Sequence, residues 1–222
     1  MEHSSNVLFS IGPLEVTSVV VSMWVIIAIL ALVSFLATRK LRDVPGPLQN
    51  AAEMAVDGLR NYYGDLIGKE NAARYFPILA TFFIFIVISN YSGLLPGAGY
   101  VFSVPTACLS VTAGLAVIAF FTTHTVGIRK LRPGGYLKSF LKPIWAMLPL
   151  TIIEQFVRPF SLALRLYGNL FGEEMVTEQL GELFPIILPL LMQVLSLLFC
   201  LIQAIVFTML LSIYIGEAIG EE

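Results

Sequence analysis

The chain has 222 residues, of which 57% are hydrophobic and only 13% are charged, and its formal net charge is -2. With a mean hydropathy of +0.85, it is far more apolar than a soluble domain, in which roughly a quarter of the residues are charged. This composition excludes an ordinary soluble protein and predicts an integral membrane protein, and no nucleic-acid partner is expected.

The first apolar stretch covers residues 16–37, close to the roughly 20 residues that a helix needs to cross a bilayer. No Lys or Arg precedes it, so a membrane span is favoured over a cleaved signal peptide. The basic residues Arg39, Lys40 and Arg42 follow it. Because Lys and Arg in short loops mark the cytoplasmic side, we expect the amino terminus to lie outside.

Residues 45–72 mix apolar and charged side chains in an amphipathic pattern. This pattern favours a helix that either lies on the cytoplasmic membrane surface or packs against another protein. Two more apolar spans are predicted at residues 75–95 and 107–126. The next segment is again basic and is expected to be cytoplasmic; its cations are Arg129, Lys130, Arg132, Lys138 and Lys142.

The last two apolar segments, residues 144–175 and 185–216, are longer than a perpendicular crossing requires. A helix of that length would measure about 48 Å, against a hydrocarbon layer of about 30 Å. We therefore expect a hairpin of two steeply tilted or bent helices. The predicted fold is an all-α, single membrane domain over residues 1–222, with about five membrane helices and one amphipathic surface helix. Its carboxyl terminus is expected in the cytoplasm.

Arg165 lies in the otherwise apolar stretch SLALRLYGNLFG. A guanidinium keeps its proton, and placing one at the centre of a bilayer costs from ~3 to over 10 kcal/mol, so a compensating interaction is required. At about 100° per residue, several polar or small residues share its helix face. These are Glu154, Arg158, Ser161, Gly168, Asn169 and Gly172. The Gly168 and Gly172 pair would let another helix approach closely, and the whole face fits a carboxylate on that helix.

The segments IEQFVRPFSLALRLYGNLFGEE and LIQAIVFTMLLSIYIGEA resemble the two carboxyl-terminal helices of subunit a of F-type ATP synthases, and NYSGLLPG is also similar to that family. The resemblance covers most of the chain. Its specific parts are the Arg-Leu-aromatic-Gly-Asn core and the Gln-Ala of the last helix. It implies that Arg165 is the essential stator cation, and that Asn169, Glu174 and Gln203 belong to an ion half-channel.

This sequence departs from the family pattern at two positions. Ser196 stands where many members carry His or Glu, and Cys108 stands where a PTAD-like motif would have Asp. Ser196 lies about 20° from Gln203 on one face of the last helix, so the ion pathway that the resemblance implies for Gln203 is expected to include Ser196 as well. Cys108 and Cys200 lack C-x-x-C spacing, and neither a disulfide nor a zinc site is predicted.

Two pairs of residues leave alternatives open. Glu173 lies about 80° around the helix from Arg165 and Glu174 about 180°, so geometry favours Glu173 as the neighbour of the arginine face. The family pattern instead favours Glu174 as the half-channel acid. Glu154 and Arg158, one turn apart, either neutralise each other or line a possible exit path.

The resemblance implies a non-catalytic stator subunit with two offset half-channels, which couples H⁺ or Na⁺ translocation to rotation of a rotor ring. The expected partners are an oligomeric rotor c-ring, peripheral stalk subunit b, other ATP synthase subunits and the lipid bilayer, in a bacterial plasma membrane. No cofactor or metal is expected. The alternative is a stand-alone ion channel or secondary transporter; an intramembrane enzyme is disfavoured because no H-E-x-x-H or G-x-S-x-G motif is present.

Overall fold

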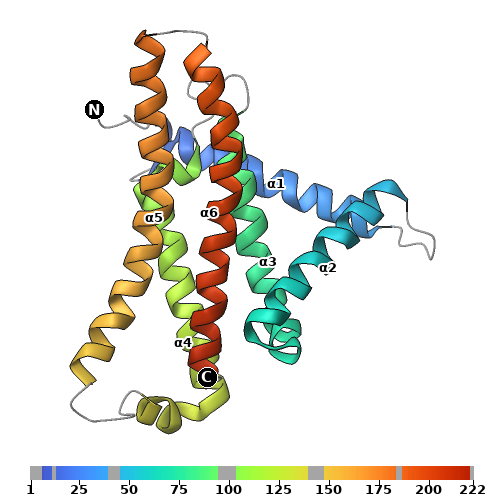
Figure 1. Cartoon of the computed structure of the whole chain (residues 1–222), viewed down its shortest axis with the longest axis vertical. Coiled ribbons are helices and arrows are strands. Elements are labelled where there is room, and N and C mark those ends of the chain that lie inside the picture. The colour runs from blue at the N-terminus through green and yellow to red at the C-terminus, as the bar shows by residue number, and fades with distance from the viewer. Residues whose placement is uncertain are drawn as a thin grey trace.

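The computed structural model describes residues 7–11, 14–39, 46–94, 104–139, 148–183 and 187–220. The chain forms a bundle of long helices (Figure 1). In chain order, the elements are β1 (Val7–Ile11), β2 (Leu14–Thr17), α1 (Ser18–Thr38), α2 (Pro47–Ile67), α3 (Lys69–Tyr91), the 3-10 turns η1 (Ser92–Leu94) and η2 (Pro105–Ala107), α4 (Leu109–Ser139), α5 (Leu148–Leu183) and α6 (Ile187–Ile219). The predicted helical membrane fold is confirmed, with the addition of a short antiparallel β1–β2 pair.

Four of the helices in the described ranges have the length and composition of membrane spans. They cover Ser18–Leu36 in α1, Lys69–Tyr91 in α3, Leu109–Arg132 in α4 and Leu190–Ile219 in α6. The remaining predicted span, residues 144–175, corresponds to α5, which is long enough but carries ionisable side chains along its length, including Glu154, Arg158, Arg165 and Glu173. The composition of α5 therefore sets it apart from the four apolar helices.

Residues 45–72, predicted as one amphipathic segment, contain α2 and the first turn of α3. Pro47 is the first residue of α2, a position where its missing N–H costs no hydrogen bond. Between the two helices Gly68 has φ 76°, a left-handed conformation that glycine adopts without a Cβ clash. The chain turns sharply at Gly68, and α2 packs against α3.

Helix α2 buries one face against the bundle and leaves the other exposed. Tyr63 and Ile67 are fully or almost fully buried, whereas Met54 and Val56 are exposed. Burial raises the pKa of Tyr63 to about 12, and its hydroxyl faces Thr208 of α6. The amphipathic pattern thus fixes how α2 docks on the other helices.

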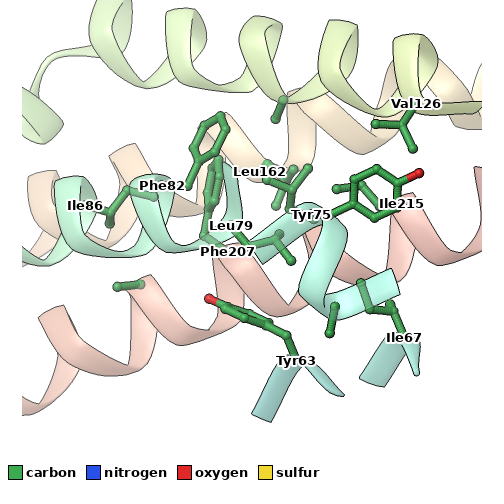
Figure 2. Packing of buried hydrophobic residues seen from close by; sticks show 14 of the residues in the cluster. Tyr63, Ile67, Tyr75, Leu79, Phe82, Ile86, Val126, Leu162, Phe207 and Ile215 are labelled. Atoms are coloured by element: carbon green, nitrogen blue, oxygen red, sulfur yellow. The ribbon is translucent and has the colours of Figure 1, made fainter. Parts of the chain in front are cut away.

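Helix α6 is the centre of the packing, because it contacts α2, α3, α4 and α5. Its buried residues recur every three or four positions, as expected for one face of a helix; they are Ala204, Phe207, Leu211, Ile215 and Ile219. Figure 2 shows Phe207 against Phe82 of α3, and their ring centroids are 5.8 Å apart in a stacked arrangement. Contacts on several sides fix the rotation of α6, and hence the direction of its polar side chains.

Helices α5 and α6 run side by side in opposite directions (Figure 1). The end of α5 and the start of α6 lie together at one end of the bundle, and the carboxyl-terminal part of α6 lies at the other end, near the last part of α4. Helix α4 continues past its predicted end at residue 126 and kinks at Arg132, where φ is 60° just before Pro133. The basic segment therefore belongs largely to α4. Lys40, Arg42 and Lys142 lie outside the described residues.

Candidate functional site

Arg165 lies on an open strip of α5. Its side chain is exposed, and it forms no ion pair with any carboxylate in the part of the chain that the structure describes. A methyl group added at Gly168 or Gly172 would meet no atom within 4 Å. The helix surface beside the Arg165 cation therefore carries no bulky side chain and is not covered by neighbouring atoms. A helix from another chain would need such a surface in order to approach closely.

The opposite side of α5 explains why Arg165 faces outward. Leu162, Ala163 and Leu166 are buried there, and α5 packs against α4 and α6. Burying these three residues fixes the rotation of α5, since Arg165 lies about 60° or more around the helix from each of them. Apolar packing thus directs the guanidinium away from the bundle.

Asn169 and Gln203 join α5 to α6 directly. The Asn169 amide Nδ2 donates a hydrogen bond to Gln203 Oε1 over 3.2 Å. Gln203 is only 4% exposed, and its Nε2 has no hydrogen-bond partner among the described residues. A buried amide donor without a partner costs free energy, so this position favours contact with a water molecule that accepts the hydrogen bond.

A small pocket between α3, α5 and α6 surrounds this amide pair. It is lined by Asn90, Asn169, Leu170, Glu173, Phe199, Cys200 and Gln203. The Glu173 carboxyl lies close to the Ser196 hydroxyl of α6. Glu174, in contrast, is exposed and does not line the pocket. The structure therefore brings Glu173, rather than Glu174, together with Asn169, Ser196 and Gln203.

Asn90 of α3 is a further pocket residue, for which no role was expected from the sequence. It is 1% exposed, and its Nδ2 donates to the backbone oxygen of Cys200 over 3.2 Å. Its Oδ1 has no hydrogen-bond partner in the described ranges, and neither have the buried hydroxyls of Ser89 and Thr106. The only sequence signal for Asn90 was its place in NYSGLLPG. Asn90 thus extends the polar lining of the pocket from α5 and α6 to α3.

Gly93 in the same motif allows a close approach of the chain. A Cβ at this position would lie 2.8 Å from Cγ2 of Val104, closer than a real Cβ contact permits. The glycine therefore lets η1 pack against the residue that precedes η2. This packing holds η1, which directly follows α3, against the start of η2.

Arg158, two turns before Arg165 on α5, has a different environment. Its Nη2 lies 2.8 Å from Oε1 of Glu154, and its Nη1 pairs with Glu217 of α6. The guanidinium also lies over the ring of Tyr214, 4.8 Å from the centroid. Glu154 and Arg158 thus form the ion pair that was one of their two expected arrangements. Glu217 is an additional partner that no sequence pattern indicated.

A second pocket, between α4, α5 and α6, lies beside this ion-pair cluster. Its polar lining consists of Thr123, His124, Gln155, Arg158 and Tyr214. Polar side chains therefore occur on both sides of Arg165 along the bundle, around Asn169 and around Arg158. No group of three His, Cys, Asp or Glu residues among the described positions could hold a metal ion.

Comparison with known proteins shows which family this chain resembles over most of its length. The model of the ATP synthase A chain family matches residues 20–216. ATP synthase subunit a of Moorella thermoacetica is 44% identical over 169 residues, which cover 76% of this chain and 75% of that protein. ATP synthase subunit a 2 of a Bradyrhizobium species is 39% identical over 217 residues, or 98% of this chain and 95% of that protein.

Proposed function

Because this chain belongs to the ATP synthase A chain family, we propose that it is the stator subunit that couples ion flow across the membrane to rotation of a rotor ring. The observation that supports this most is the exposed Arg165, which has no carboxylate partner among the described residues and lies beside the open Gly168 and Gly172 strip. The missing partner is a carboxylate on a helix of the rotor ring. The other partners of this chain are peripheral stalk subunit b and the remaining synthase subunits.

The outer half-channel leads to the pocket between α3, α5 and α6. An H⁺ or Na⁺ ion passes Glu173, Asn169, Ser196 and Gln203 and neutralises a rotor carboxylate. The buried polar groups without partners support this route, because a wetted path would satisfy them. The exposed Glu174 lies at the mouth of the path, where its charge raises the local cation concentration.

Arg165 acts on the rotor carboxylate that returns after a rotation. As a permanent cation, it favours the ionised form of that carboxylate by lowering its pKa, so the ion is released. The same charge blocks direct passage of ions between the two half-channels. Each charge that crosses the membrane gains about 2.3 kcal/mol per 100 mV, and this free energy drives rotation.

The inner half-channel leaves from the pocket that His124 and Gln155 line; the ion pair of Glu154 and Arg158 borders this pocket and takes no part in ion transfer. In this arrangement α5 is a fifth, tilted membrane helix beside α4 and α6 in a bacterial plasma membrane. The basic part of α4 and the carboxyl-terminal part of α6 lie at the same end of the bundle (Figure 1), which supports a cytoplasmic location for both. The amino terminus then lies outside.

Arg165→Ala tests the proposal. In assembled complexes it should abolish ion-driven ATP synthesis and increase passive ion leak, since both duties of the cation are lost. Arg165→Lys should restrict the leak better than Arg165→Ala but still fail in synthesis, because an ammonium lacks the planar fork and shifts its pKa readily. Arg129→Ala, at an exposed cation of α4, is the matched control.

Assembly is measured by immunoblotting of the purified complex, and synthesis in membrane vesicles with an imposed ion gradient. Parental synthesis by an assembled Arg165→Ala complex would contradict the proposal. Ion transport by the purified chain without a rotor ring would instead favour a stand-alone channel or transporter.

A further inference from the structure

The strip of α5 that carries Arg165 also carries a second arginine. Arg158 precedes Arg165 by seven positions, so the two lie within about 20° of each other around the helix and about 10 Å apart along it. Arg165 is exposed, whereas the side chain of Arg158 is only 18% exposed. A rotor carboxylate that slides along this strip could meet either cation, so the difference between them matters.

The surroundings of Arg158 cancel its charge. Glu154 binds one guanidinium nitrogen over 2.8 Å, Glu217 binds the other, and the ring of Tyr214 covers a face of the group. One positive and two negative charges leave the cluster with a net charge of -1. Arg165 has no such acid among the described residues, although it lies near enough to Tyr214 to act on it electrostatically.

We propose that Glu154 and Glu217 mask the charge of Arg158, so that Arg165 is the one cation of this strip that a rotor carboxylate can bind. This inference rests on the proposed function. At an effective dielectric constant near 20, a free cation about 10 Å from Arg165 would attract the carboxylate toward itself. It would change the ratio of carboxylates held beside Arg158 to those held beside Arg165 by about tenfold. Unmasked, Arg158 would hold the returning carboxylate at the wrong depth.

The same contacts could instead serve to tie the end of α6 to α5. The two roles predict different results, because masking depends on net charge and a tie depends on the bonds. If the role is masking, either carboxylate alone suffices, and removing Arg158 repairs the loss of both. If the role is a tie, removing Arg158 breaks the last bonds and repairs nothing.

The experiment compares ATP synthesis per assembled complex in vesicles with an imposed ion gradient. Glu154→Gln and Glu217→Gln should each lower synthesis by less than about twofold, because the cluster becomes neutral but not cationic. The double variant Glu154→Gln/Glu217→Gln frees one positive charge and should lower synthesis by about tenfold. Adding Arg158→Gln to this double variant should recover most of the lost activity. A triple variant no better than the double variant would overturn the inference.

A second variant keeps the test decisive if the double variant does not assemble. Glu154→Gln/Arg158→Gln retains the net charge of -1 but has no guanidinium to bind Glu217. Masking predicts that it keeps more than half of the parental synthesis, and a loss as large as about tenfold would overturn masking in favour of a tie. Arg165→Ala is measured in parallel. If it retains synthesis, the proposed function has failed; if it loses synthesis while the triple variant does not recover, only the masking inference has failed.

Discussion

Asn169 on α5 donates a hydrogen bond to Gln203 on α6, with 3.2 Å between Nδ2 and Oε1. The two side chains form one polar unit in the pocket that Glu173 lines. Each Leu variant replaces an amide of the proposed ion path with an apolar side chain and removes an interhelical hydrogen bond that contributes about 0.6–2 kcal/mol to packing. We therefore expect Asn169→Leu or Gln203→Leu to lower ATP-driven ion pumping severalfold. The double variant should lose little more than the worse single variant, because both changes remove the same interaction.

The exchange Asn169→Gln/Gln203→Asn is the control for this pair, since it keeps two amides of the same total size. It should pump better than either Leu variant. Strictly multiplicative losses in the double Leu variant would mean that the two amides act independently, contrary to the observed hydrogen bond.

Glu173 and Glu174 should differ in their importance. Glu173 lines the pocket and faces Ser196, whereas Glu174 is exposed outside it. We expect Glu173→Gln to reduce ATP-driven pumping more strongly than Glu174→Gln, measured as the rate of ion uptake into inverted vesicles. Each Gln keeps the size of the side chain and removes the charge, so each variant serves as the control for the other. Equal pumping by Glu173→Gln and the parent would assign the half-channel acid to Glu174.

Local helix geometry could be predicted from the sequence because it depends on spacing alone. The 3.6-residue period indicated that Glu173 and Glu174 lie on different sides of the helix, and Glu173 lines the pocket whereas Glu174 is exposed outside it. That Glu173 is the neighbour of the Arg165 face stays a prediction. The same period placed Gly168 and Gly172 beside the cation, where the structure leaves them open.

Contacts between distant segments could not be predicted in this way. Asn90 meets the backbone of Cys200 across 110 positions of sequence, and Arg158 meets Glu217 across 59. Such pairs depend on how whole helices pack, and no periodic pattern in one segment specifies them. The kink at Arg132 is intermediate, because the following Pro133 disfavours a helical conformation at Arg132 without dictating the turn that replaces it.

Packing around Phe207 should govern the stability of the bundle. Phe207 is completely buried and stacks on Phe82 of α3 (Figure 2). Truncating a buried Phe typically costs about 3–5 kcal/mol, so Phe207→Ala should clearly lower the thermal unfolding midpoint of the detergent-solubilised complex. Leu198→Ala, at a residue of α6 that is 54% exposed, is the matched control and should change the midpoint little. Similar shifts for both variants would argue against Phe207 as a centre of packing.

The orientation of the chain can be tested with single cysteines at two positions. Lys130 lies in the basic part of α4 and Gly181 in the last turns of α5, toward opposite ends of the bundle (Figure 1). In a background with Cys108 and Cys200 replaced, an impermeant thiol reagent added outside should label Gly181→Cys and leave Lys130→Cys unmodified. The reverse should hold in inverted vesicles, since short basic segments remain in the cytoplasm. Labelling of both cysteines from the same side would contradict a membrane crossing by α5 and reduce the count to the four apolar helices.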